Sequence, residues 1–203
     1  MIPLNSTIAL AITGASGASY GLRLLEMLLH AERSVSLLIS DPAKINIEIE
    51  TGLVLPDHPE EVRTILTDRY NTRPKQLTVF GLNEWTAPMA SGSNAPHSFV
   101  ICPCSSGTLS AVAAGASGSL LERAADVVLK ERRQLILVTR EMPLSTIHLE
   151  NMLKLAHLGV IIMPASPGFY HRPQTVGELV DFVVARILDH LGIEHTLVPR
   201  WKE

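Results

Sequence analysis

The stretch LAITGASGASYG, residues 10–21, joins an apolar segment to a turn of small residues and then to a helix-like segment. This order directs the backbone N–H groups of the turn, Thr13-Gly14-Ala15-Ser16-Gly17, toward a point where a phosphate can bind. A second turn of this kind, Ser105-Ser106-Gly107-Thr108, follows another apolar segment. Serine and glycine are also common helix caps, so one such turn says little, but two of them favour a phosphorylated ligand.

Polar and charged side chains follow the other apolar segments of the chain. Ser40 ends the apolar segment 34–40, Arg140 and Glu141 stand at the end of segment 134–140, and residues 166–172, with Tyr170, follow segment 160–165. In an open α/β sheet, ligands bind beyond the carboxyl ends of the strands. We therefore expect all of these groups along one edge of a sheet, beside the two turns.

Apolar runs rich in Val, Ile and Leu alternate with helical patterns, which is typical of parallel strands covered on both faces. The sequence predicts a single domain over residues 1–203, with a doubly wound α/β fold. Its mostly parallel sheet would be Rossmann-like or flavodoxin-like, with helices on both faces. The expected strands are residues 7–13, 34–40, 76–80, 99–104, 134–140 and 160–165. The expected helices are residues 20–30, 59–69, 108–116, 120–132, 148–157 and 176–191.

Two segments depart from this alternation of strands and helices. In residues 45–50, three isoleucines alternate with Asn46, Glu48 and Glu50, which is the period of a strand with one exposed face. Residues 86–96 form a loop of small residues that contains Ser91 and Gly92. A loop of this length in a compact domain is usually functional or mobile.

The composition excludes several classes of function. The 203 residues are 46% hydrophobic and 18% charged with a net charge of −3, so a folded protein is expected, without nucleic acid or an acidic membrane as partner. No apolar run approaches the roughly 20 residues of a membrane span, and no signal-peptide pattern is present. The two cysteines, Cys102 and Cys104, and the histidines lack metal-ligand spacing. We therefore expect reduced thiols, no metal and a cytoplasmic location.

A nicotinamide dehydrogenase is one hypothesis for the first turn. The turn is similar to that of short-chain dehydrogenases, which have a further glycine two residues after Gly17, whereas the next glycine here is Gly21. That family also needs a tyrosine with a lysine four residues later, and Tyr20, Tyr70 and Tyr170 all lack one. The hypothesis therefore fits poorly.

Five segments together resemble the UbiX-type flavin prenyltransferases. These are GASG, ICPCSSGTLSAVA, ERAADVVLKERR, TREMPLSTIHLENMLKL and PASPGFYHRPQTVGELVDFVVARILDHLGI, and the resemblance spans about residues 8–201. The family belongs to a homo-oligomeric flavin-binding group that also includes peptidyl-cysteine and phosphopantothenoylcysteine decarboxylases. The resemblance implies a metal-independent transferase that joins the dimethylallyl group of dimethylallyl monophosphate to N5 and C6 of reduced FMN and releases phosphate. It also implies a large assembly, commonly a dodecamer, and a product, prenylated FMN, that serves a UbiD-type decarboxylase.

The resemblance also implies roles for individual residues. The FMN-binding residues would be Gly14, Ala15, Ser16, Ser40, Ser105, Ser106, Gly107, Thr108 and Arg140. The prenyl phosphate would contact Tyr170, Arg186, Lys130 and Arg140, and the same substrate would lie near Arg123, Ser91, Gly92, Trp85 and Trp201. Glu50 would handle the proton of flavin N5, Ser16 would link N5 to Glu141, and Glu141 would relay a proton to the departing phosphate.

The residues alone leave other interpretations of these charged groups open. Lys130 and Arg123, seven residues apart on one expected helix face, also fit a solvated basic surface. Arg186, at the flank of an apolar helix stripe, could extend its charged group to solvent. Glu50 could be an exposed strand carboxylate equivalent to Glu48.

The chain departs from the family pattern at two positions, with Ser106 where threonine is usual and Ser119 where asparagine is usual. The hydroxyl of residue 106 is kept, whereas the resemblance implies that the loop of Ser119 lies near a neighbouring subunit's flavin. Two other functions remain open. A flavin-dependent cysteine decarboxylase would bind FMN without needing Tyr170 or Arg186, and a flavin carrier would bind FMN and catalyse nothing.

Overall fold

Six parallel strands form one sheet in the computed structural model, which describes residues 7–200. The strand order is β3-β2-β1-β4-β5-β6, so the chain moves outward in one direction from β1 and then in the other from β4. The strands are β1 (Ile8–Ile12), β2 (Val35–Ile39), β3 (Leu77–Phe80), β4 (Ser98–Cys104), β5 (Gln134–Thr139) and β6 (Ile161–Ile162). The predicted doubly wound α/β fold is confirmed, and its switch point lies between β1 and β4.

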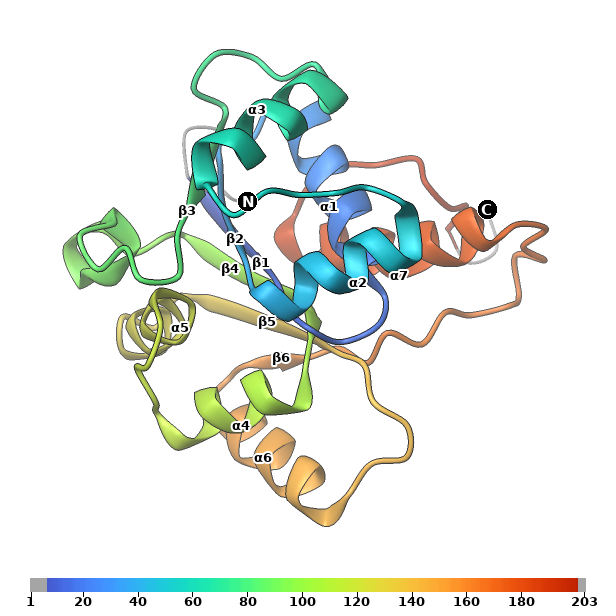
Figure 1. The fold of residues 1–203 in the computed structure, drawn as a ribbon. Coiled ribbons are helices and arrows are strands. Elements are labelled where there is room, and N and C mark those ends of the chain that lie inside the picture. Colours follow the sequence, from blue (N-terminus) through green and yellow to red (C-terminus); the bar gives the residue numbers. More distant parts are fainter. Residues whose placement is uncertain (1–6, 201–203) are drawn as a thin grey trace.

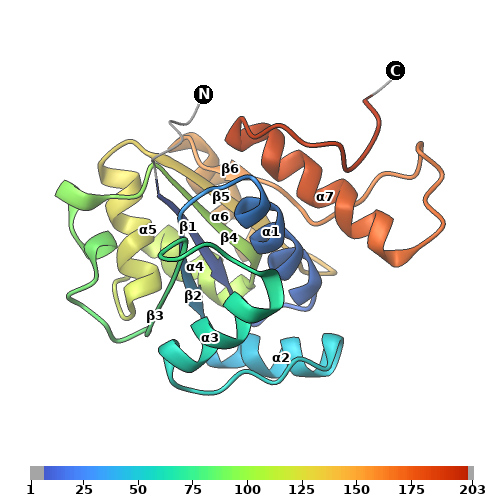
Figure 2. The ribbon, with the colours of Figure 1, turned by 90° about the horizontal axis from the view of Figure 1, so that it is seen from above.

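Helices cover both faces of the sheet (Figure 1). One face carries α1 (Ala18–His30), α2 (Asp41–Thr51), α3 (Pro59–Tyr70) and α7 (Val176–Leu191). The other face carries α4 (Ser106–Ala114), α5 (Leu120–Lys130) and α6 (Thr146–His157), with two 3₁₀ turns, η1 (Pro88–Ala90) and η2 (Gly92–Asn94). Figure 2 shows α7 running alongside α1. None of the helices between residues 7 and 200 is long and apolar enough to cross a lipid bilayer.

The central strand β1 is apolar and buried at every position because both of its faces are covered by helices. In β1, Ile8, Leu10 and Ile12 pack in the core beneath α1 and α7. Ala9 and Ala11 point the opposite way and pack in the core beneath α4 and α5. Each fully buried leucine or isoleucine side chain contributes about 1.5–3 kcal/mol of transfer free energy. The sheet is therefore a rigid base for the loops at its carboxyl edge.

The prediction of strand-like structure in residues 45–50 is wrong, because these residues lie in α2. Ser40 caps the helix by accepting a hydrogen bond from the Ala43 amide at 3.3 Å, and Gly52 ends it with φ of +72°. Only Ala43 and Ile47 of α2 are buried, four residues apart, whereas Ile45 and Ile49 are exposed. The burial period is that of a helix, and the alternation of isoleucines has no structural counterpart.

Candidate functional site

The two Ser/Gly turns lie side by side at the switch point, as the strand-end rule predicts. Thr13 follows β1, and its hydroxyl donates to the Pro103 carbonyl at 2.7 Å and accepts from the Ser105 amide at 2.8 Å. Gly14 has no room for a side chain, because an added Cβ would lie 2.5 Å from Cβ of Pro42 at the start of α2. The turns after β1, β2 and β4 are thus packed into one crevice.

The N-terminus of α1 is already filled by a carboxylate of this chain. Gly17 caps the helix with φ of +106°, and the Glu50 carboxylate accepts from its amide at 2.9 and 3.1 Å. Glu50 also accepts from the Ala18 amide at 2.7 Å. A negative charge is favourable at this end of a helix. Glu50 is therefore fixed at the crevice by its contacts with α1, whereas Glu48 on the same helix makes no side-chain contact of this kind among the described residues.

The N-terminus of α4, in contrast, is open. Ser105 caps it by accepting from the Thr108 amide at 3.3 Å, and the two hydroxyls lie 3.0 Å apart. Among residues 7–200, no acceptor is found for the N–H groups of Ser106 and Gly107. A Cβ added at Gly107 would meet nothing within 4 Å. Unpaired amides at a helix N-terminus form a site for a phosphate, and these residues fit the phosphate of FMN.

Arg140 brings a positive charge between the two turns. Its Nε donates to the Ser16 carbonyl at 3.2 Å, so the side chain reaches from β5 to the first turn. Tyr20 lies close by, and its pKa is raised chiefly by burial, with opposing effects of Arg140, which lowers it, and Glu50, which raises it. Tyr20 was not predicted as a site residue, since its only sequence signal is its position three residues after Gly17. Glu141 is exposed, and its carboxylate accepts from the Met142 amide at 3.2 Å.

A second set of predicted residues, the loop cluster, lies on the face covered by α5. It consists of Ser91, Gly92, Arg123 and Lys130. Arg123 donates through Nε to the Ala90 carbonyl at 3.2 Å, and a Cβ added at Gly92 would lie 2.7 Å from Nζ of Lys130. Both cations also pair with acidic neighbours on or beside α5, so the structure accommodates them without a ligand.

Tyr170 and Arg186 form a third set, the edge cluster, together with Phe182. The Tyr170 and Phe182 rings meet edge to face with centroids 5.6 Å apart, and Arg186 follows Phe182 by one turn of α7. Arg186 lines a cavity of about 240 Å³ beside Ile161 and Ile162 of β6. Its side chain is 53% exposed and donates to Asp189. The cluster therefore lies beside the edge strand.

Within one chain, the loop cluster is far from the crevice. Lys130 precedes β5 and Arg140 follows it, and the six residues of β5 span roughly 20 Å.

The remaining predicted residues lie elsewhere. Trp85 begins the loop that leads to η1 and is 48% exposed, whereas Trp201 lies outside the described residues. Ser119 caps α5 by accepting from the Glu122 amide at 3.3 Å, so a helix-capping role explains the serine there.

The two cysteines are buried beneath the second turn. Burial raises the pKa of Cys104 to about 12 and moves that of Cys102 higher still. Within the described residues, no group of three or more His, Cys, Asp or Glu side chains is placed to hold a metal ion.

Both thiols should therefore resist thiol-specific reagents in the native protein at pH 8, because the reactive thiolate forms only well above that pH. Dithionitrobenzoate should modify two thiols per chain after unfolding in guanidinium and neither before. Rapid labelling of the native protein at pH 8 would contradict this assignment.

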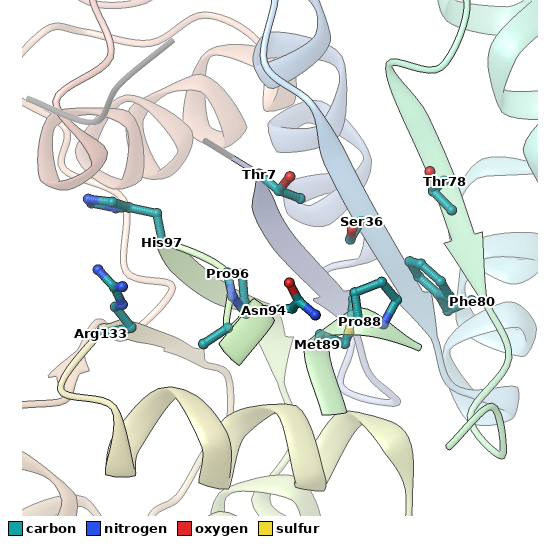
Figure 3. A pocket seen from close by; sticks show the side chains of 11 residues that line it. Thr7, Ser36, Thr78, Phe80, Pro88, Met89, Asn94, Pro96, His97 and Arg133 are labelled. Atoms are coloured by element: carbon teal, nitrogen blue, oxygen red, sulfur yellow. The ribbon is translucent and has the colours of Figure 1, made fainter. Parts of the chain in front are cut away.

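A cavity of about 550 Å³ opens at the amino ends of the strands, opposite the crevice (Figure 3). Thr7, Ser36 and Thr78 contribute hydroxyls to it, and Arg133 lies near His97 at one side. Burial, together with Arg133, lowers the pKa of His97. Every residue that lines this cavity lies outside the predicted site.

Comparisons with known proteins place this geometry in context. The chain matches the family model described as Flavoprotein over residues 4–188. It is 60% identical over 196 residues to a flavin prenyltransferase UbiX of Pseudomonas aeruginosa, covering 97% of this chain and 94% of that protein. The solved structure of AnUbiX in complex with FMN and dimethylallyl pyrophosphate is 37% identical, with a TM-score of 0.86 and 98% of each chain covered. A dodecameric FMN-dependent UbiX-like decarboxylase from Escherichia coli is 41% identical, with a TM-score of 0.86, covering 97% of this chain and 100% of that chain.

Proposed function

The chain belongs to the flavoprotein family and, within it, to the UbiX flavin prenyltransferases, and we propose that it prenylates reduced FMN. The reaction joins the dimethylallyl group of dimethylallyl monophosphate to N5 and C6 of the flavin and releases phosphate. The likeness to flavin prenyltransferases along nearly the whole chain carries this proposal. The crevice supports it, because an open helix N-terminus, an arginine and a fixed carboxylate meet there.

FMN is the cofactor, and its phosphate belongs at the N-terminus of α4. The amides of Ser106 and Gly107 have no acceptor in the described chain, and the hydroxyls of Ser105 and Thr108 flank them. Gly14, Ala15, Ser16, Ser40 and Arg140 line the rest of the proposed flavin site. The bound flavin supplies the nucleophilic N5 and C6 atoms in its reduced form.

Glu50 is the proposed acceptor of the proton from flavin N5. Three contacts with the amides of Gly17 and Ala18 hold its carboxylate at the first turn. Ser16 lies in that turn beside Arg140, where it would link N5 to Glu141. Glu141 is exposed next to Arg140 and is the proposed donor of a proton to the departing phosphate.

The substrate phosphate carries negative charge, which cationic side chains can stabilise by charge-assisted hydrogen bonds. Lys130, Arg140 and Arg186 are the proposed ones, together with the Tyr170 hydroxyl. The same substrate would lie near Arg123, Ser91, Gly92, Trp85 and Trp201. Because the loop cluster and the edge cluster lie away from the crevice, we propose that neighbouring copies bring them to it. The dodecameric state of the Escherichia coli relative supports a dodecamer here as well.

Three wider assignments belong to the same proposal. Residues 1–203 form one flavoprotein domain, which the single sheet and the span of the family match support. The prenylated FMN passes to a UbiD-type decarboxylase that uses it as cofactor. The protein works in the cytoplasm, where its two free, buried thiols remain reduced.

One anaerobic experiment tests the function. Purified protein should co-elute with FMN or take it up, and mixing the reduced complex with dimethylallyl monophosphate should raise the flavin mass by one prenyl group, seen by mass spectrometry. A flavin without added mass, together with loss of carbon dioxide from a cysteine peptide mixed with the oxidised FMN complex, which accepts the two electrons, would indicate a cysteine decarboxylase. If FMN binds but neither dimethylallyl monophosphate nor the cysteine peptide reacts, the protein is a flavin carrier. Binding of NAD without binding of FMN would contradict the proposed flavin site.

A further inference from the structure

Thr13 connects the two turns of the crevice through a single hydroxyl. The side chain is 1% exposed, donates to the Pro103 carbonyl at 2.7 Å and accepts from the Ser105 amide at 2.8 Å. The Thr13 amide also donates to the Pro103 carbonyl at 3.2 Å. Water cannot replace these contacts easily, because the hydroxyl is buried between the strands. The relative position of the turns therefore depends on this side chain.

The regular ladder between the strands ends just before this point. β1 pairs with β4 from Ile8–Ser98 to Ala11–Ile101, and the pairing of β4 with β5 shifts register between Ile101 and Cys104. Such irregularities are common beside functional sites, where they redirect the chain. The Thr13 amide still donates to the Pro103 carbonyl at the end of this ladder, and the Thr13 hydroxyl adds the contact that carries the connection on to the Ser105 amide in the second turn.

The contact to Ser105 aligns the open end of α4. Ser105 is the N-cap of α4, and the unpaired amides of Ser106 and Gly107 follow it directly. A hydroxyl is needed at position 13 because it must donate to one turn and accept from the other. Serine keeps both capacities, whereas valine keeps the shape of threonine and loses both.

We propose that Thr13 is a positioning residue that sets the distance between the first turn, which holds Glu50, and the phosphate-binding end of α4. This inference rests on the proposed function, since it assumes that FMN spans the two turns. Thr13 itself need not touch the flavin. Its loss would leave the part-buried Ser105 amide without its acceptor, and Ser105 would move to satisfy that amide.

The test compares Thr13→Val with Thr13→Ser in the full-length protein. Fluorescence titration of the apoprotein with FMN should show about 10- to 100-fold weaker binding for Thr13→Val, and Thr13→Ser should restore affinity to within about threefold. Thr139→Val is the matched control, because Thr139 is 5% exposed at the end of β5 and its hydroxyl makes no hydrogen bond in the described chain. This control should bind FMN like the wild type.

Hydrogen exchange separates this inference from the flavin assignment. In the apoprotein, the Ser105 amide should exchange slowly in the wild type and in Thr13→Ser but rapidly in Thr13→Val, whether or not FMN binds. If Thr13→Val does not fold, Thr13→Cys, whose thiol is a weak donor, takes its place. Unchanged Ser105 exchange, or an FMN loss equal to that of Thr139→Val, would overturn the inference. A wild type that binds no FMN would instead overturn the proposed function.

Discussion

Replacing Glu50 with glutamine should slow formation of prenylated FMN by about 10²- to 10⁴-fold, the usual contribution of a general base. Glutamine has the same volume as glutamate, and its side-chain oxygen can still accept a hydrogen bond from the backbone N–H of Gly17 or Ala18. FMN and substrate should therefore still bind. Proton acceptance from flavin N5 is the property that is lost. Single-turnover absorption spectra of the reduced complex after mixing with dimethylallyl monophosphate measure this rate.

Glu48→Gln is the matched control for this prediction. Glu48 lies on α2 two residues before Glu50, is exposed and makes no side-chain contact in the described chain. The control should prenylate FMN at the wild-type rate. Equal rates for Glu50→Gln and the wild type would refute the assigned role, and equal losses in both variants would point to the overall charge of α2 instead.

Arg186→Ala should weaken the binding of dimethylallyl monophosphate by roughly ten- to a hundredfold. Loss of one charge-assisted hydrogen bond costs about 1.5–3 kcal/mol. FMN affinity should stay unchanged, because Arg186 lies beside β6 and not in the crevice. Titration of substrate and of FMN into separate samples, together with the KM of the prenylation, measures the two effects independently.

Arg63→Ala controls for the loss of a surface ion pair. Arg63 pairs with Glu60 at 2.7 Å with the same i,i+3 spacing as the pair of Arg186 with Asp189. Exposed pairs of this kind are worth at most about 1 kcal/mol, so this variant should bind substrate normally. Parallel losses of FMN and substrate affinity in Arg186→Ala would show that Arg186 supports the fold and does not bind the phosphate.

Local patterns predicted the sheet well because its central strands are buried on both faces. The edge strand was predicted as residues 160–165, whereas β6 covers only Ile161–Ile162, although Met163 and Ala165 still donate main-chain hydrogen bonds to β5 beyond its end. The helix α2 was missed because its signal lies in its caps, Ser40 and Gly52, and not in its isoleucines.

The predicted crevice followed from the strand-end rule, whereas its internal contacts did not. Glu50 reaches an amide 33 residues away and Thr13 reaches one 92 residues away, and no local pattern encodes such contacts. The resemblance to the prenyltransferase family implied a role for Glu50 but not its contacts with the start of α1. It implied no role for Thr13 or Tyr20. The separation of the loop cluster from the crevice depends on the length of β5 and on the direction of α5, which only the folded chain defines.

The carboxylate at the start of α1 also explains which nucleotides this fold excludes. Dinucleotide-binding proteins of related topology place a pyrophosphate at the N-terminus of the helix after the first strand. Here Glu50 occupies that position with its own negative charge, so a pyrophosphate would meet electrostatic repulsion and find its amide donors already engaged. Of the two turns of the described chain, the second, at the open N-terminus of α4, is thus the one left for the phosphate of a nucleotide. We therefore expect the crevice to prefer a ligand with a single terminal phosphate over NAD or FAD, although its first turn is similar to that of a dehydrogenase.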